Sequence, residues 1–194
     1  MSEFKVNTIT NKDGSYGPQV CGITTFGSSG VTLPNGPTEF RGGNGSGGQR
    51  GRGLFAGGET PRLNVIDKIE ISTTGNAADF GDLVVGRQIG AGAASSTRGL
   101  IAGGQNPGPN TDAIETVEIA SVGNATDFGD LSVSRRGPGG CSDCIRAVFV
   151  AGSTPSEQNT MDYVHFATKG DATDFGNSND TGFSAGTSNG HGGL

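Results

Sequence analysis

The sequence predicts an all-β protein, arranged as a glycine-rich array of three units of about 47 residues. The first observation is composition: 37 of the 194 residues are glycine and only 31% are hydrophobic, and glycine disfavours a helix by about 1 kcal/mol relative to alanine. The other two observations are phrases, Arg-Gly-Leu-Phe-Ala-Gly-Gly and Gly-Asn-Ala-Ala-Asp-Phe-Gly, that each return twice in related form. The first phrase and its relatives begin at Arg52, Arg98 and Arg146, and the second at Gly75, Gly123 and Gly170.

The spacing of the phrases indicates a repeat architecture. The arginines that open the first phrase are 46 and 48 residues apart, and a period in this range is typical of stacked or radial repeats. The units are placed at residues 52–97, 98–145 and 146–194. A leading strand at 41–51 precedes them, because Arg41 and Arg52 repeat the spacing of 11 residues between Arg87 and Arg98. The recurring structural anchors are Arg52, Arg98, Arg146, Asp79, Phe80, Asp127, Phe128, Asp174 and Phe175.

Each unit is expected to hold four short strands. In the first unit they lie at Gly53–Ala56, Val65–Thr73, Ala78–Val84 and Gln88–Ser95. The first strand ends at a glycine pair, and the second alternates apolar and polar residues, as a half-buried strand does. A Gly-Asn turn introduces the third strand, because these residues readily supply positive φ angles. The fourth strand consists almost entirely of small residues, so neighbouring backbones can approach it closely.

Four short antiparallel strands in about 47 residues are typical of a propeller blade. The glycine pair after the first strand resembles the kelch type of blade, although the Trp usual in that blade is missing. A recurring aromatic residue is expected to pack between blades, since a buried ring removes a large apolar area from water. The candidates are Phe80, Phe128 and Phe175. The predicted units are therefore propeller-blade-like, or kelch-like.

The number of units predicts an oligomer. Three blades are too few to close a propeller, for which about four to eight are usual, and an open array leaves sheet faces and edges exposed. Two chains would close a six-bladed ring, and three chains would pack their sheets into a trimeric spike. A homo-oligomer, dimer or trimer, is therefore expected.

Residues 1–40 do not follow the repeat. They contain two short strand-like pieces, at 6–10 and 22–26, among Gly, Ser, Pro and Asn. Such a segment cannot bury itself and is expected to become ordered against a partner. The chain is therefore divided into an extended N-terminal arm for attachment or oligomerisation, residues 1–40, and a β-repeat domain, residues 41–194.

Charge and hydropathy exclude several classes of partner. The formal net charge is −6, and binding to nucleic acid rests on basic patches, so no nucleic-acid partner is expected. No stretch approaches the roughly 18 apolar residues of a membrane span, so membrane insertion is not expected. The first residues lack the basic start and apolar run of a signal peptide, which predicts synthesis and assembly in a cytoplasm.

Two short motifs resemble catalytic or metal-binding signatures. Asp-Phe-Gly occurs three times and matches the magnesium-binding triplet of protein kinases, but the other kinase motifs are missing. Its recurrence at the repeat period identifies it as architecture. Cys141 and Cys144 form a Cys-x-x-Cys pair, but they align with Ala93 and Ser96 of the first unit. Both cysteines are therefore expected to pack as small buried residues.

Histidines and recurring acids are the remaining candidates for chemistry. His165 aligns with glutamates on the outward face of the second strand, which predicts a solvated side chain. Asp67, Glu115 and Asp162 recur in the three units. They either line one surface as a cation or sugar site, or pair with the recurring arginines and turn backbone, and the second arrangement is favoured. The sequence therefore predicts no enzyme, with no catalytic residue, cofactor or metal.

Four stretches carry a family resemblance: Val6 to Ile9 in the arm, the segment from Gly30 to Gly43, and the two repeat phrases. On these residues the chain resembles the kelch-like repeat-containing structural proteins of tailed bacteriophages, particularly phages of marine bacteria. The resemblance covers most of the chain. It implies a virion component that is displayed externally as a fibre, spike or decoration.

We therefore expect a structural virion protein that docks onto other virion proteins through residues 1–40 and displays the β-repeat domain. An alternative is a host receptor-binding tail-fibre adhesin, which binds a cell-surface glycan through the loops that differ most between units. A cellular kelch-like scaffold that closes without a virion partner is a third hypothesis. The loop residues predicted to contact a ligand or partner are Glu59, Arg62, Gln105, Asn110, Glu157 and Asn159.

Overall fold

The computed structural model describes residues 51–59, 62–71, 73–179 and 182–188. All regular structure in these residues is β-strand, so the predicted all-β fold is confirmed. The predicted arm and residues 41–50 of the predicted leading strand lie outside the described residues. In the described part of the chain, no helix is long and apolar enough to cross a membrane.

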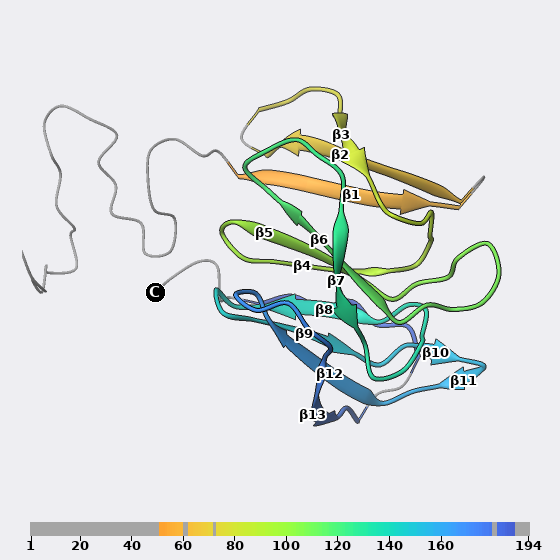
Figure 1. Ribbon diagram of the computed structural model, residues 1–194. Helices are drawn as coiled ribbons and strands as arrows, with labels where there is room; N and C mark the ends of the chain where they lie inside the picture. Colours follow the sequence, from red (N-terminus) through yellow and green to blue (C-terminus); the bar gives the residue numbers. More distant parts are fainter. Residues whose placement is uncertain (1–50, 60–61, 72, 180–181, 189–194) are drawn as a thin grey trace, which may run out of the picture. The chain divides into compact units, whose positions relative to one another are not determined.

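The strands form three antiparallel sheets and one small hairpin (Figure 1). The first sheet contains β1 (Arg52–Gly58), β2 (Leu63–Glu70) and β3 (Ala78–Asp82). The second sheet contains β4 (Ala91–Ala94), β5 (Arg98–Ala102), β6 (Ala113–Glu118) and β7 (Thr126–Asp130). The third sheet contains β8 (Gly139–Ser142), β9 (Arg146–Val150), β12 (Thr160–His165) and β13 (Thr173–Asn177). The hairpin contains β10 (Ser153–Thr154) and β11 (Ser156–Glu157).

The hydrogen-bonded sheets are offset from the units read in the sequence. β4 pairs with β5, with Ala91 opposite Ala102, and β8 pairs with β9 in the same way. The strand predicted as the last of one unit is therefore the first strand of the next sheet. Each sheet is a blade-like meander of three or four strands.

A polar side chain stabilises the first turn of each complete sheet. Ser95 Oγ accepts hydrogen bonds from the N–H groups two and three residues later, at 3.3 and 3.1 Å. Asp143 Oδ1 accepts bonds from the N–H groups of Arg146 and Ile145, at 2.6 and 2.7 Å. These two bonds hold the pKa of Asp143 below its ordinary value. Ser and Asp favour turns because they bond nearby backbone in this way.

The sheets are stacked in chain order and pack through two different faces (Figure 1). The trailing face of a sheet is defined here as the face toward the next sheet, and the leading face as the face toward the preceding one. The trailing face of the first sheet presents Leu54, Ala56, Ile66 and Phe80, and the leading face of the second sheet presents Ile101 and Val117. With Leu83 and Ala125 these residues form one core.

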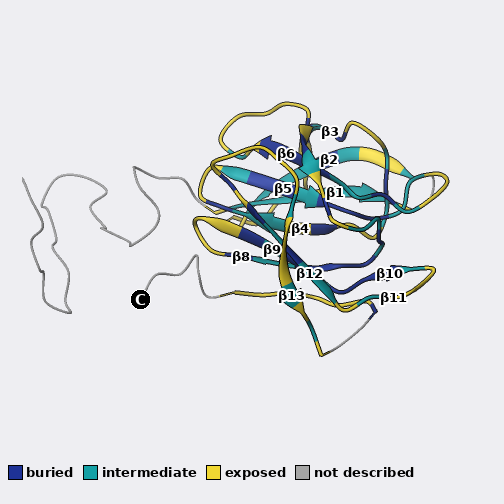
Figure 2. Ribbon diagram, turned by 60° about the horizontal axis from the view of Figure 1, so that its bottom comes forward, coloured by how far each residue is buried: buried dark blue, intermediate teal, exposed yellow. Residues whose placement is uncertain are grey.

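The same faces meet again between the second and third sheets. The trailing face of the second sheet presents Leu100, Ala102, Ile114 and Phe128, and the leading face of the third sheet presents Phe149 and Val164. Ala91, Leu131, Ala147 and Phe166 complete this second core. Figure 2 shows buried residues inside the stack and exposed residues mainly in the turns. Each interface is therefore a repetition of the other.

The first strands of successive sheets lie directly against one another. A Cβ atom on Gly140 of β8 would lie 2.3 Å from the carbonyl oxygen of Gly92 of β4, and a Cβ on Gly186 would lie 2.2 Å from the carbonyl oxygen of Gly140. The predicted close approach of small-residue strands is therefore confirmed. Residues 184–188 lie against β8 in the same way as β8 lies against β4. We call these three segments, β4, β8 and residues 184–188, the inner row.

Candidate functional site

The Phe of each Asp-Phe-Gly triplet is an extra residue in its strand. β2 and β3 pair on both sides of Phe80, which itself has no residue opposite, and the same bulge occurs at Phe128 and Phe175. A β-bulge re-aims a side chain. Phe80 and Phe128 are completely buried between sheets, whereas Phe175 is half exposed because no described sheet follows the third. The triplet therefore serves the packing of one sheet on the next.

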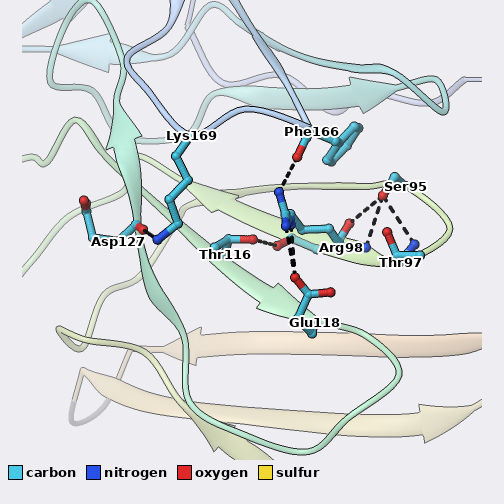
Figure 3. Close-up of polar contacts among 9 residues, drawn as sticks. Ser95, Thr97, Arg98, Thr116, Glu118, Asp127, Phe166 and Lys169 are labelled. Carbon is cyan, nitrogen blue, oxygen red and sulfur yellow. Dashed lines mark hydrogen bonds and ion pairs between the residues drawn. The ribbon is translucent and has the colours of Figure 1, made fainter.

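The first two recurring arginines of the first phrase join neighbouring sheets. Arg98 pairs with Glu118 of its own sheet at 3.2 Å and donates to the backbone carbonyl of Phe166 in the third sheet (Figure 3). Arg52 pairs with a glutamate of its own sheet at 3.3 Å and donates to the carbonyl of Ile119 in the second sheet. Both side chains therefore connect two sheets.

The remaining predicted anchors lie at the surface. Arg146 is exposed, and its guanidinium lies 5.7 Å from the centroid of the Tyr163 ring. Three recurring acids are also exposed: Asp79, Asp127 and Asp174. The main chain of Asp127 is nevertheless used, because Lys169 Nζ donates to its carbonyl oxygen at 2.7 Å (Figure 3).

Backbone hydrogen bonds join a turn of one sheet to the last strand of the preceding sheet. The N–H groups of Gly123 and Ala125 donate to the carbonyls of Phe80 and Asp82, at 2.9 and 2.8 Å. The turn at residues 170–172 makes the same two bonds to β7, at 2.9 and 2.7 Å. The Gly-Asn and Gly-Asp turns predicted before the third strands therefore also act between sheets.

Two buried ion pairs lie between sheets, and their arginines are not among the predicted anchors. Arg87 pairs with Glu115, and Arg135 pairs with Asp162 at 2.8 Å. All four side chains are almost completely buried. Burial lowers the pKa of Arg87, and the attraction and hydrogen bond of Glu115 offset part of this effect. Glu115 and Asp162 therefore pair with arginines as predicted, but their partners are Arg87 and Arg135 and not the arginines that open the first phrase.

The same two acids also accept hydrogen bonds from turn backbone. Glu115 Oε2 accepts from the N–H of Val84 at 2.8 Å, and Asp162 Oδ2 accepts from the N–H of Ser132 at 3.2 Å. Each turn belongs to the preceding sheet, so each acid holds its own sheet to that neighbour. Asp67, opposite Phe55, occupies the corresponding position on the leading face of the first sheet.

A groove of about 700 Å³ follows the open edge of β1. β1 is an edge strand, because β2 is its hydrogen-bonded neighbour in the first sheet and no described strand pairs with its other side. The groove is lined by β1, by the small residues of β4 and β8, and by residues 186–188. Its walls are mainly backbone and short side chains, which suits the insertion of another strand.

Three of the predicted loop residues come together at one edge of the array. Arg62 Nη2 donates to Gln105 Oε1 at 3.2 Å, and Gln88 Nε2 donates to the same oxygen at 3.0 Å. Asn110 forms an isolated bridge with Gln105 and donates to the carbonyl of Ser153 at 3.0 Å. A shallow groove of about 440 Å³ lies beside them, lined by Gln105, Pro109, Asn110, Arg136, Ser153 and Thr154.

The other three predicted loop residues lie outside this contact network. Glu59 is exposed in the turn after β1, and Glu157 is exposed in β11. The backbone carbonyl of Asn159 accepts a hydrogen bond from the N–H of Ser178 at 2.7 Å. The structure therefore assembles half of the predicted loop residues into one polar edge.

The structure corrects the prediction for the second cysteine. Cys141 is partly buried in β8, but Cys144 is exposed. The prediction that Cys144 packs as a buried residue is wrong, because the chain reverses direction after Ser142 and the strand alignment does not extend into the turn. His165 is exposed on β12 opposite Arg146, as predicted.

No three His, Cys, Asp or Glu side chains of the described residues are grouped so as to hold a metal ion. A scan against protein-family models finds no match to the chain, and a search of curated proteins finds none. The inter-sheet contacts and the polar edge are therefore the features of the described residues that bear on function.

Proposed function

We propose that the chain is a non-enzymatic structural component of a tailed-phage virion. Residues 1–40 dock onto other virion proteins, and the β-repeat domain is displayed as a fibre, spike or decoration. The protein is made and assembled in the host cytoplasm and ends in the virion. The resemblance of the arm and repeat phrases to phage structural proteins supports this assignment.

The observation that carries the proposal is the use of the recurring side chains. The buried aromatic rings and the buried ion pairs all hold one sheet on the next. Each sheet has two different faces that complement those of its neighbours, and a unit of this kind can be stacked repeatedly. This construction supports a homo-oligomer, either a dimer or a trimer.

Incorporation into particles tests the proposal. The full chain, with an affinity tag after residue 194, is expected to co-purify with phage particles from cells that produce both. A variant without residues 1–40 is expected to stay folded and to be lost from the particles, because the arm makes the attachment. Quantitative mass spectrometry of purified particles measures the difference. Particles that hold none of the full chain would contradict the proposal.

A host receptor-binding tail-fibre adhesin is the second candidate function, and the polar edge favours it. Gln105, Asn110 and Arg136 line a groove of about 440 Å³. Amide and guanidinium groups can form hydrogen bonds with sugar hydroxyls. A cell-surface glycan is the corresponding ligand.

Loop replacement separates the two functions. The loops at 59–64, 105–112 and 154–159 would be replaced by glycine and serine, and adsorption of the resulting particles to host cells measured. An adhesin predicts lost adsorption with normal particle yield. Unchanged adsorption would contradict the adhesin, and a loss of intact particles would support the structural role.

A further inference from the structure

The two ends of the stack present faces that are buried elsewhere in the same array. The trailing face of the third sheet carries Val148, Val150, Met161, Tyr163 and Phe175. Phe175 is 48% exposed, whereas the equivalent Phe80 and Phe128 are 0% and 1% exposed because another sheet covers them. The third sheet therefore has the side chains of an inter-sheet interface without a described sheet to cover them.

The leading face of the first sheet is the complementary case. Phe55 is 61% exposed, whereas Phe149, its equivalent in the third sheet, is 0% exposed. Ile69 lies on the same face at the position of Val117 and Val164, which are both buried. Single exposed apolar side chains are common on protein surfaces, but neighbouring ones on one sheet face, as Phe55 and Ile69 are, mark an interaction site.

Polar groups at the two ends match in the same way. Arg52 and Arg98 each donate to the carbonyl of the residue that follows the third strand of the next sheet, which is β6 or β12. Arg146 has their position in the third sheet, and Ile71 of the first sheet supplies the corresponding carbonyl. The end faces therefore hold both halves of a contact that occurs twice inside the chain.

Two further contacts have separated halves at the ends. Inside the chain, a turn of the second sheet bonds to β3 and a turn of the third sheet bonds to β7. In the first sheet the corresponding turn residues, Gly75 and Ala77, are exposed. In the third sheet the strand corresponding to β3 and β7 is β13. Asp67 has the position of Glu115 and Asp162. Glu115 and Asp162 accept hydrogen bonds from the N–H groups of Val84 and Ser132, and the N–H of Asn179 has the corresponding position in the third sheet.

The inner row shows where the strands of two chains would meet. Residues 184–188 lie against β8 but belong to no described sheet, and the first sheet has three strands and a free β1 edge. Gly140 and Gly186 are each closely covered by the carbonyl of the preceding strand, whereas a Cβ on Gly92 would meet no described atom within 4 Å. A strand on the β1 edge would fill this space.

We propose that a second copy of this chain packs head to tail, with the leading face of its first sheet on the trailing face of the third sheet. Residues 184–188 of one chain add to β1 of the other, and so complete a four-stranded sheet. Two chains bring six sheets together, within the roughly four to eight of closed propellers, and two identical heterologous interfaces close the ring. The inference deepens the proposed homo-oligomer and rests on that part of the proposed function.

Charged substitutions on the two faces test the interface. Phe55→Asp and Phe175→Asp are each expected to convert the full chain from twice to once the mass of a single chain, measured by light scattering after size exclusion. Both positions are exposed in one chain, so circular dichroism should remain unchanged. Val122→Asp, at a turn residue that is 58% exposed, is the matched control and is expected to remain a dimer. A dimer that persists in both face variants would overturn the proposal.

Mixing the two variants tests the head-to-tail arrangement. A chain with Phe55→Asp keeps its trailing face, and a chain with Phe175→Asp keeps its leading face. The mixture is therefore expected to form a heterodimer through one intact interface, although each variant alone is a monomer. A chain with both substitutions should rescue neither. Failure of the mixture to associate would contradict the head-to-tail arrangement.

Gly92→Ala tests the identity of the strand on the β1 edge. The added methyl group is expected to weaken dimerisation at least tenfold and to leave the unfolding midpoint of the dilute monomer unchanged. Gly108→Ala, at another glycine with no described atom near the added Cβ, is the control. If residues 41–48 of the same chain fill the edge instead, Gly92→Ala lowers the monomer's own stability, and that result would overturn strand exchange.

The outcomes separate this inference from the virion assignment. A purified chain that is monomeric at every concentration contradicts the head-to-tail ring, whatever it does in particles. A chain that forms the ring but never enters particles contradicts the virion role and leaves the ring standing. The two measurements use different samples, so each result is assigned to one proposal.

Discussion

At the residue scale, buried charges couple neighbouring sheets of the array. Arg135 and Asp162 are both inaccessible to solvent, and Asp162 also accepts bonds from the backbone and hydroxyl of Ser132. Burying ions costs several kcal/mol each, and the cost is recovered only when the partners are in place. Such a pair adds little net stability, and we expect it to favour one packing arrangement of the sheets.

Removal of one partner should therefore be strongly destabilising. Asp162→Ala leaves the Arg135 guanidinium buried without its carboxylate, and we expect the free energy of unfolding to fall by about 3–5 kcal/mol. Urea denaturation followed by circular dichroism measures this change. Asp127→Ala, at an exposed recurring acid, is the control and should stay within about 0.5 kcal/mol. Replacement of both partners by apolar residues should recover much of the loss, and no recovery would contradict this explanation.

The role of a single residue can be predicted from the sequence where its recurrence in each unit is enough to show that role. The pairing of Glu115 and Asp162 with arginines was predictable because the acids recur, but Arg87 and Arg135 were not among the anchors. Arg87 and Arg135 lie 28 and 27 residues before Glu115 and Asp162 in the sequence. Only the stacking of the sheets brings each arginine to its acid. Phe175 shows the opposite limit, since the sequence repeats the residue but not the sheet that would cover it.

At the element scale, hairpin geometry sets the composition of the sheets. The Ser95 turn joins β4 to β5 through three residues, 95–97, so these strands pair directly. The eight residues 83–90 between β3 and β4 carry the chain to the next sheet instead. Repeat phrases give the period but not the frame, because any starting point yields the same spacing. The four strands per unit were therefore predictable, and the sheet to which the fourth belongs was not.

A methyl group added to a closely packed glycine of the inner row should lower stability, whereas one added to an open glycine should not. The Cβ that Gly140→Ala adds would lie 2.3 Å from the carbonyl oxygen of Gly92. We expect the free energy of unfolding to fall by about 1–3 kcal/mol, because overpacking forces the backbone to shift. Thermal unfolding of the dilute chain measures it. Gly108→Ala is the open-space control. An unchanged midpoint for Gly140→Ala would mean that β4 and β8 are not in contact in solution.

At the scale of the whole molecule, the array is held together by nearest-neighbour contacts. The second sheet has a neighbour on both faces, whereas the first and third sheets each have one described neighbour. Stability in such arrays is approximately a sum of unit and interface terms. An added interface at the two ends would therefore raise the stability of the sheets that have the fewest contacts within one chain.

This argument predicts that the melting temperature depends on protein concentration. If two chains form the ring, each hundredfold rise in concentration adds about 1.4 kcal/mol per chain by mass action, or a rise of about 3–6 °C for a chain of this size. Differential scanning calorimetry over that range measures it, with Phe55→Asp as the variant whose melting temperature should stay constant. If the leading face of the first sheet forms the interface, a charge on that face must remove the dependence of the melting temperature on concentration. Equal dependence in the two proteins would therefore mean that this face contributes nothing to association.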